Sequence, residues 1–274
     1  MFIPILSVIT AVFATLTILL RRKGKSFEGM LCKFISSFGF MSMAFIGFCY
    51  RIDEADKVLH PFYFCLVAFG LLFGLGGDVL LGIKEIAPKY KTRLIALGTF
   101  AFLIGHFFYL ASFYMAYPRF SIIPYIAAVI ITAITAVIMK AVKMKLDSKM
   151  FALSVFYFFV IALCACVSGY MLYLTRSLTF LITTVASVIF VISDSVLAFV
   201  YFTPVKRKNP LVTIELATYY TGQILMASGV LDEITHIKTK IAPMRGALRK
   251  EVRLSYIRPT VSCIVLRTVI LCFA

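Results

Sequence analysis

The chain has 274 residues, 62% of them hydrophobic, and its mean hydropathy is +0.99. Soluble domains are only about half apolar, so this composition excludes a soluble globular protein and predicts a membrane protein with several spans. The net charge is +16, but the basic residues lie between apolar runs, where they set orientation and meet anionic lipid head groups. Nucleic-acid binding is therefore not expected.

Eight apolar stretches are long enough to cross a bilayer as helices, because a hydrocarbon core of about 30 Å needs roughly 20 helical residues. The first stretch is followed, not preceded, by basic residues, which favours a helix over a signal peptide. Prolines fall at the ends of later stretches, where helices stop. In chain order the predicted spans are residues 2–20, 30–50, 61–83, 94–117, 121–142, 150–174, 178–202 and 211–230. They predict an all-α membrane protein, an eight-helix transmembrane bundle.

Basic residues alternate between the connections of these spans. The second, fourth and sixth connections hold only Arg51, Lys57, Arg119 and Arg176. The odd connections hold Arg21, Arg22, Lys23 and Lys25; Lys84, Lys89, Lys91 and Arg93; Lys140, Lys143, Lys145 and Lys149; and Lys206, Arg207 and Lys208. Because cytoplasmic loops retain Lys and Arg, the odd connections are predicted to be cytosolic and the amino terminus lumenal or exterior.

Residues 231–274 depart from this alternation. They form a basic segment followed by an apolar end, residues 261–274, which contains Arg267 and is short for a span. Eight spans would place this basic tail on the lumenal side. Three explanations remain open: the tail lies on the membrane as an amphipathic segment, one span is miscounted, or the tail is a variant terminus.

The third predicted span carries a lone carboxylate, Asp78, within the glycine-rich residues 69–82. A carboxylate at membrane depth costs at least ~2.5 kcal/mol, so we expect it to face a protein interior or a water-filled cavity, or to be protonated. The glycines allow a neighbouring helix or a lipid chain to approach closely. The alternative is a helix that serves packing alone, with a carboxylate that is merely hydrogen-bonded.

The seventh predicted span repeats this pattern. Residues 193–198, Ser-Asp-Ser-Val-Leu-Ala, align with residues 77–82, Gly-Asp-Val-Leu-Leu-Gly, and place Asp194 opposite Asp78. In the span after each of these two motifs, a polar residue directly follows a glycine: Gly105-His106 in one and Gly222-Gln223 in the other. Because four spans separate the copies, the pattern predicts a possible parallel internal repeat of four plus four helices.

Helix direction places these polar side chains in the middle-to-cytosolic part of the membrane. The candidate site residues are Asp78, His106, Tyr109, Asp194, Tyr219, Tyr220 and Gln223, with Glu215 at the cytosolic mouth. We expect the two aspartates to share one dehydrated chamber, in which one carries a proton and the other stays charged. The alternative is that His106 is an interhelical hydrogen-bonding residue and that the tyrosines are interface anchors.

The seven cysteines form no C-x-x-C pair and lie in or beside apolar runs. This distribution is typical of small buried apolar residues and not of a disulfide framework or a metal site. We therefore expect no metal and no cofactor.

At four motifs the sequence resembles the YhhN family of eight-span membrane proteins, whose characterised animal members are the lysoplasmalogenases of the transmembrane protein 86 group. The motifs are residues 77–81, 102–109, 193–198 and 219–223, and the resemblance covers roughly residues 30–230. It implies a YhhN-like domain of eight helices in residues 1–230. The basic tail, residues 231–274, is atypical for the family.

The resemblance implies a hydrolase that cleaves the vinyl ether bond of lysoplasmalogens into a fatty aldehyde and glycerophosphoethanolamine or glycerophosphocholine. Asp78 and Asp194 would divide the roles of acid and anion, and the remaining candidate residues would position water and the glycerol oxygen. The substrate partner would be a lysophospholipid with an alkenyl chain, drawn from the surrounding membrane lipids, with its phosphate near the basic cytosolic mouth. The family also implies an endoplasmic reticulum address.

Two other classes of protein remain open. A transporter or proton-coupled carrier also places paired carboxylates at mid-membrane in a repeat structure. A scaffold or lipid-sensing protein would tolerate loss of either aspartate.

Overall fold

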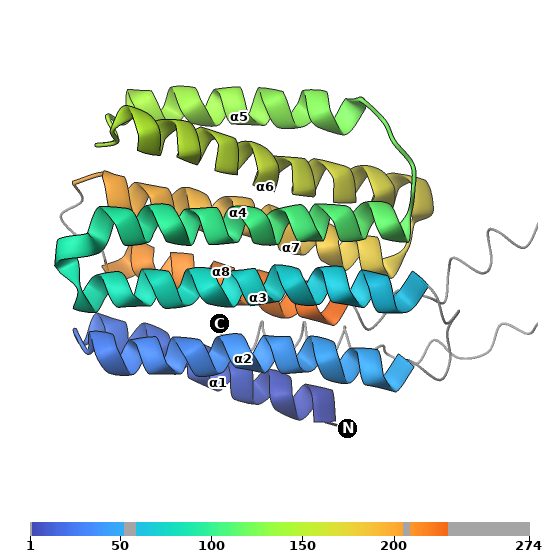
Figure 1. Cartoon of the computed structure of the whole chain (residues 1–274), viewed down its shortest axis with the longest axis horizontal. Coiled ribbons are helices and arrows are strands. Elements are labelled where there is room, and N and C mark those ends of the chain that lie inside the picture. The colour runs from blue at the N-terminus through green and yellow to red at the C-terminus, as the bar shows by residue number, and fades with distance from the viewer. Residues whose placement is uncertain (1, 52–58, 205–208, 230–274) are drawn as a thin grey trace, which may run out of the picture.

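The part of the chain that the computed structural model describes forms a bundle of eight α-helices whose axes lie side by side, with neighbours in sequence running in opposite directions (Figure 1). The structure describes residues 2–51, 59–204 and 209–229, so the predicted tail, residues 231–274, lies outside the described residues. The helices are α1 (Phe2–Arg22), α2 (Ser26–Arg51), α3 (Leu59–Ile86), α4 (Lys91–Ala116), α5 (Ile123–Ala141), α6 (Ser148–Thr175), α7 (Leu178–Phe202) and α8 (Asn209–Gly229), with the short 3-10 helix η1 (Pro88–Tyr90) before α4. All eight predicted spans are helices, and the predicted all-α membrane bundle is confirmed.

The helices α1 to α7 are each long and apolar enough to cross a membrane. Helix α8 is more polar, because it carries Glu215 and Gln223 together with several Thr and Tyr residues, and it buries both of these side chains inside the bundle. The outer surface is apolar. Helix α5, at the edge of the bundle in Figure 1, exposes Ile123, Ile126 and Val137 by 64%, 54% and 67%. Such a surface suits contact with lipid chains.

Side-chain caps fix the starts of α6 and α7. The Asp147 carboxylate accepts a hydrogen bond from the Met150 amide at 2.7 Å, which starts α6. The Ser177 hydroxyl accepts one from the Phe180 amide at 3.2 Å, which starts α7. Each cap satisfies an amide that has no partner within its helix.

The two halves of the chain have the same order of neighbours. Helix α1 packs on α2, α2 on α3 and α3 on α4, and likewise α5 packs on α6, α6 on α7 and α7 on α8. The halves meet through α4 against α6 and, in the equivalent position, α8 against α2, while α8 also packs on α1 and α3 without an equivalent in the other half. Helices α3 and α7 run in the same direction (Figure 1). This arrangement agrees with the predicted parallel repeat.

The glycine in each repeated Gly-polar pair lies where two helices approach closely. A Cβ atom on Gly105 of α4 would lie 2.9 Å from the backbone oxygen of Gly70 on α3. A Cβ atom on Gly222 of α8 would lie 2.8 Å from the ring of Phe190 on α7. Both distances are shorter than van der Waals contact, so a larger residue would separate the helix pairs that carry the polar side chains.

We predict that Gly105→Ala destabilises the protein, because its methyl group meets backbone that cannot move aside. Overpacking of this kind typically costs about 1–3 kcal/mol. Gly76→Ala is the matched control, since a Cβ there has no atom within 4 Å. We expect thermal unfolding in detergent to occur at lower temperature for Gly105→Ala and at an unchanged or higher temperature for Gly76→Ala. Equal unfolding temperatures would contradict the close contact of α3 with α4.

Candidate functional site

Asp78 is buried on α3, with 2% of its surface exposed, and three side chains surround its carboxylate. The Lys33 ammonium lies 2.9 Å from Oδ1 and forms an ion pair. The hydroxyls of Ser37 and Tyr219 donate hydrogen bonds to Oδ2 at 2.6 and 2.7 Å. Lys33 and Ser37 stand one turn apart on α2, so both reach the same side of that helix. Two hydroxyl donors on Oδ2 and the charge of the ammonium next to Oδ1 stabilise the ionised carboxylate, and Oδ1 itself has no hydrogen-bond partner among the described residues.

A chain of hydrogen bonds connects Asp78 to α4 through α8. Tyr219 accepts a hydrogen bond from the Gln223 side-chain amide at 3.0 Å, and the Gln223 carbonyl accepts one from the Tyr109 hydroxyl at 3.3 Å. Tyr220 is fully buried and joins this group by contact of its ring with that of Tyr219, 5.5 Å between centroids. The predicted residues Asp78, Tyr109, Tyr219, Tyr220 and Gln223 are thus brought together, and we call them the Asp78 network.

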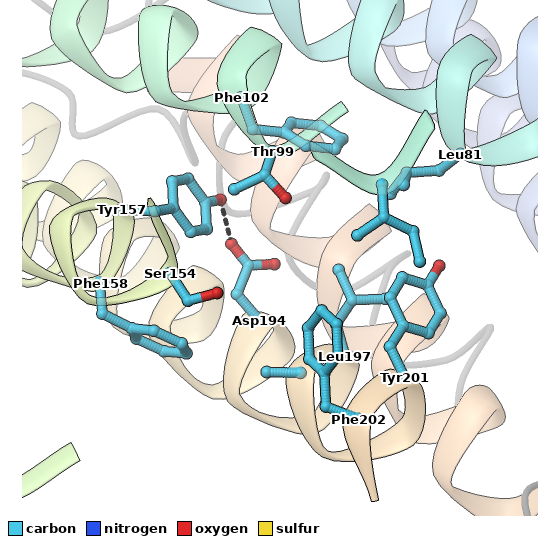
Figure 2. Close-up of a pocket in the computed structure, with 12 residues that line it drawn as sticks. Leu81, Thr99, Phe102, Ser154, Tyr157, Phe158, Asp194, Leu197, Tyr201 and Phe202 are labelled. Carbon is cyan, nitrogen blue, oxygen red and sulfur yellow. Dashed lines mark hydrogen bonds between the residues drawn. The ribbon is translucent and has the colours of Figure 1, made fainter. Parts of the chain in front are cut away.

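Asp194 lies on α7 at a separate cavity between α3, α4, α6 and α7 (Figure 2). Its carboxylate accepts a hydrogen bond from the Tyr157 hydroxyl on α6. The cavity has a volume of about 30 Å³, and roughly 10–15 Å³ is enough for one water molecule. Besides Asp194 and Tyr157, it is lined by Leu81, Ile95, Thr99, Phe102, Ser154, Phe158, Leu197, Ala198, Tyr201 and Phe202. The hydroxyl and carboxylate groups among these residues make it a suitable place for water beside Asp194.

His106 on α4 lies between the Asp78 network and the Asp194 cavity. Its ring contacts Tyr109 of the network at 5.6 Å and Tyr157 of the cavity at 5.7 Å between centroids. Nδ1 lies 2.8 Å from the Phe102 carbonyl, so Nδ1 is the nitrogen that carries the proton. Nε2 is buried and has no hydrogen-bond partner among the residues that the structure describes. His106 can therefore accept a hydrogen bond but contacts neither aspartate by one.

The expectation that both aspartates share one chamber is wrong. Asp194 lines the cavity, whereas Asp78 does not. Phe102 lines the cavity, and its ring also packs against Tyr219 of the Asp78 network at 5.9 Å between centroids and against Gly77. The physical reason is that α2 supplies Asp78 with its own counter-charge and hydroxyl, so this carboxylate has partners apart from the second aspartate.

Glu215 is buried on α8 near the basic end of the bundle. It is 5% exposed, and its carboxylate interacts electrostatically with Lys33, Arg21 and Lys84. Its backbone oxygen accepts a hydrogen bond from the Ser193 hydroxyl at 3.1 Å, next to Asp194 in the chain. Glu215 therefore connects the environment of Asp194 with the basic end of the bundle.

Sequence reasoning missed Lys33, Ser37 and Tyr157. A usable signal existed for Lys33, because it is the lone charge within the predicted span of residues 30–50 and stands one turn before Ser37. Tyr157 gave no such signal, since tyrosines are common in the chain and α6 holds three of them. Within residues 2–51, 59–204 and 209–229, no group of three or more His, Cys, Asp or Glu side chains is placed to hold a metal ion.

Comparison with protein families agrees with the motifs. The family model of the YhhN family matches residues 30–230, which include Lys33, both aspartates and Gln223. Comparison with curated proteins and with solved structures gives no match. Since the matched segment is well over half of the chain, the protein belongs to the YhhN family.

Proposed function

We propose that this protein is a lysoplasmalogenase-like hydrolase that cleaves the vinyl ether bond of lysoplasmalogens. One observation carries the proposal: in a YhhN-family chain, a buried carboxylate, Asp194, borders a water-sized cavity and is held by Tyr157. Hydrolysis of a vinyl ether needs an acid and a water molecule at the same place, and this cavity suits both.

The reaction would use Asp194 as general acid and then as general base. Asp194 gives its proton to the β-carbon of the vinyl ether, which turns the α-carbon and the ether oxygen into an oxocarbenium ion. Water attacks the α-carbon and returns a proton to Asp194, which leaves a hemiacetal. The hemiacetal breaks its bond to the glycerol oxygen, and its hydroxyl proton moves to that oxygen. One water is consumed, and a fatty aldehyde and a glycerophospho-base are released.

Asp78 would act at longer range than Asp194. Its charge interacts electrostatically with Asp194, and a fixed negative charge in a dehydrated bundle stabilises the positive charge of an oxocarbenium ion. His106, between the Asp78 network and the cavity, would help to position water, and Tyr109, Tyr219, Tyr220 and Gln223 would hold Asp78 in place. The Asp78 network thus supports the chemistry without touching the scissile bond.

The substrate would approach from the cytosolic side of the bundle. The cavity is lined by residues of the first turns of α4 and the last turns of α7, near the basic connection between α5 and α6 that holds Lys143 and Lys145. Cations there would attract the phosphate, and the apolar wall would take the alkenyl chain. A cavity of about 30 Å³ is far smaller than an alkenyl chain, so side chains such as Leu197 and Phe202 would move on binding. We propose an endoplasmic reticulum membrane as its location.

A proton-coupled carrier is the second candidate. The observation that favours it is the buried ion pair of Lys33 with Asp78, because paired charges inside a membrane repeat are typical of ion pathways. Mass spectrometry of a lipid mixture before and after incubation with the protein in sealed vesicles separates the two. A hydrolase releases aldehyde, whereas a carrier moves its substrate without breaking a bond.

We predict that Asp194→Asn lowers the turnover of a lysoplasmenyl lipid by about 10²-fold or more, since the amide keeps the shape but has no transferable proton. Aldehyde release by purified protein in detergent measures it. Ser195→Ala is the control, because Ser195 is the exposed neighbour of Asp194 on α7. Full turnover by a folded Asp194→Asn protein would remove Asp194 from the mechanism.

We also predict that Tyr157→Phe slows turnover, by up to roughly 10-fold, because a hydrogen bond between a phenol and a protonated carboxyl group contributes about 0.5–1.5 kcal/mol. The loss should appear in kcat, since Tyr157 holds the acid and not the lipid chain. Tyr173→Phe on the same helix is the matched control, as Tyr173 is 67% exposed. Identical kcat values for the two variants would contradict the role of Tyr157.

The orientation has its own test. An N-glycosylation sequence with a spacer, inserted in the connection between α4 and α5 at residues 117–122, should be glycosylated in the endoplasmic reticulum, because this connection is predicted to be lumenal. The same insertion between α5 and α6, at residues 142–147, should stay unmodified. The opposite pattern would reverse the proposed orientation.

A further inference from the structure

A buried lysine stands beside the aspartate that does not line the cavity. Lys33 is 3% exposed, its ammonium lies 2.9 Å from Asp78 Oδ1, and it lies 5.1 Å above the centroid of the Tyr219 ring. Taking two charges out of water is costly, and apolar residues of similar volume are often as stabilising as a buried ion pair. A pair kept at this depth therefore suggests a functional role.

We propose that Lys33 is a positioning residue that keeps Asp78 ionised, so that Asp194 is the aspartate that carries the transferable proton. The inference deepens the proposed hydrolase function and rests on it for its catalytic part. It assigns different protonation states to two residues that occupy equivalent positions in the repeat.

The donors to the two carboxylates are unequal. Asp78 receives the Lys33 ammonium and the hydroxyls of Ser37 and Tyr219. Within the part of the chain that the structure describes, the hydrogen bond shown for the Asp194 carboxylate comes from a phenol, Tyr157. A cation and hydroxyl donors stabilise a charged carboxylate, whereas a buried carboxyl group with no counter-charge beside it is more stable with its proton. This difference places the charge on Asp78 and the proton on Asp194.

The surroundings of Asp78 contain no second cation in direct contact within the described residues. Titratable groups with an interaction with Asp78 include Lys33 on α2, Tyr109 on α4, Asp194 on α7, and Glu215, Tyr219 and Tyr220 on α8. Of these groups only Lys33 is positively charged, and its charge also acts on Asp194 and Glu215. Arg21 of α1 interacts with Glu215 and Tyr220. Removal of the Lys33 charge would therefore leave Asp78 facing phenols and two other acids.

Infrared spectroscopy of the purified protein reads the two protonation states without any need for activity. At neutral pH we expect the C=O band of a protonated buried carboxyl group to disappear in Asp194→Asn and to persist in Asp78→Asn. In Lys33→Met, a second band should appear and should disappear in the double variant Lys33→Met/Asp78→Asn. A wild-type band that is lost in Asp78→Asn instead would overturn the assignment, even if Lys33→Met failed to fold.

Enzyme kinetics then test the catalytic part of the inference. Lys33→Met should lower kcat at neutral pH by about 10-fold or more, as loss of one preorganised charge does, and should shift the acidic limb of the pH profile toward higher pH. Lys33→Arg keeps the charge and should retain most of the activity, and Ser42→Ala on the same helix, whose side chain is exposed, is the control. An unshifted acidic limb in folded Lys33→Met would overturn the role of Lys33. Absence of aldehyde release by the wild type would refute the hydrolase proposal alone and leave the infrared result to decide the protonation states.

Discussion

The arrangement of three helices depends on one requirement, that the charge of Asp78 has partners inside an apolar bundle. An isolated carboxylate there would cost several kcal/mol. The partners of Asp78 on α3 are Lys33 and Ser37 from α2 and Tyr219 from α8. These three helices must therefore hold a particular rotation and depth relative to one another. The apolar contacts around them are nondirectional by comparison. This polar centre therefore specifies the packing.

The second carboxylate is in a different situation. Asp194 has a phenol partner and borders space for water, while the Phe102 ring packs both on that space and on the Asp78 network. The bundle thus holds a charged centre and, beside it, a small cavity with room for water. A reaction that develops positive charge near water could use both, and the proposed hydrolysis is of this kind.

Much of the fold could be predicted from the sequence, because each apolar run is long enough, as a helix, to cross the hydrocarbon core of a membrane. Basic residues in every second connection mark the ends of the runs. The aspartates could be found because a lone charge in an apolar run is unusual. Their partners could not be found with equal ease. Ser37 and Asp78 are 41 positions apart, and Tyr219 and Asp78 are 141 apart. Whether such residues meet depends on how each helix is rotated about its axis, and uniformly apolar faces leave that rotation unspecified.

The two halves place their aspartates at equivalent positions but in different surroundings. The residue four positions before the aspartate is Gly74 on α3 and Phe190 on α7. Gly74 leaves room for the Gln223 amide, whereas Phe190 puts an aromatic ring against His106. Both motifs keep the aspartate, and the inequality comes from other residues of the same helices and from the different partners that the facing helices supply. Matching positions in two similar halves can thus be given unequal roles by the few side chains that surround them.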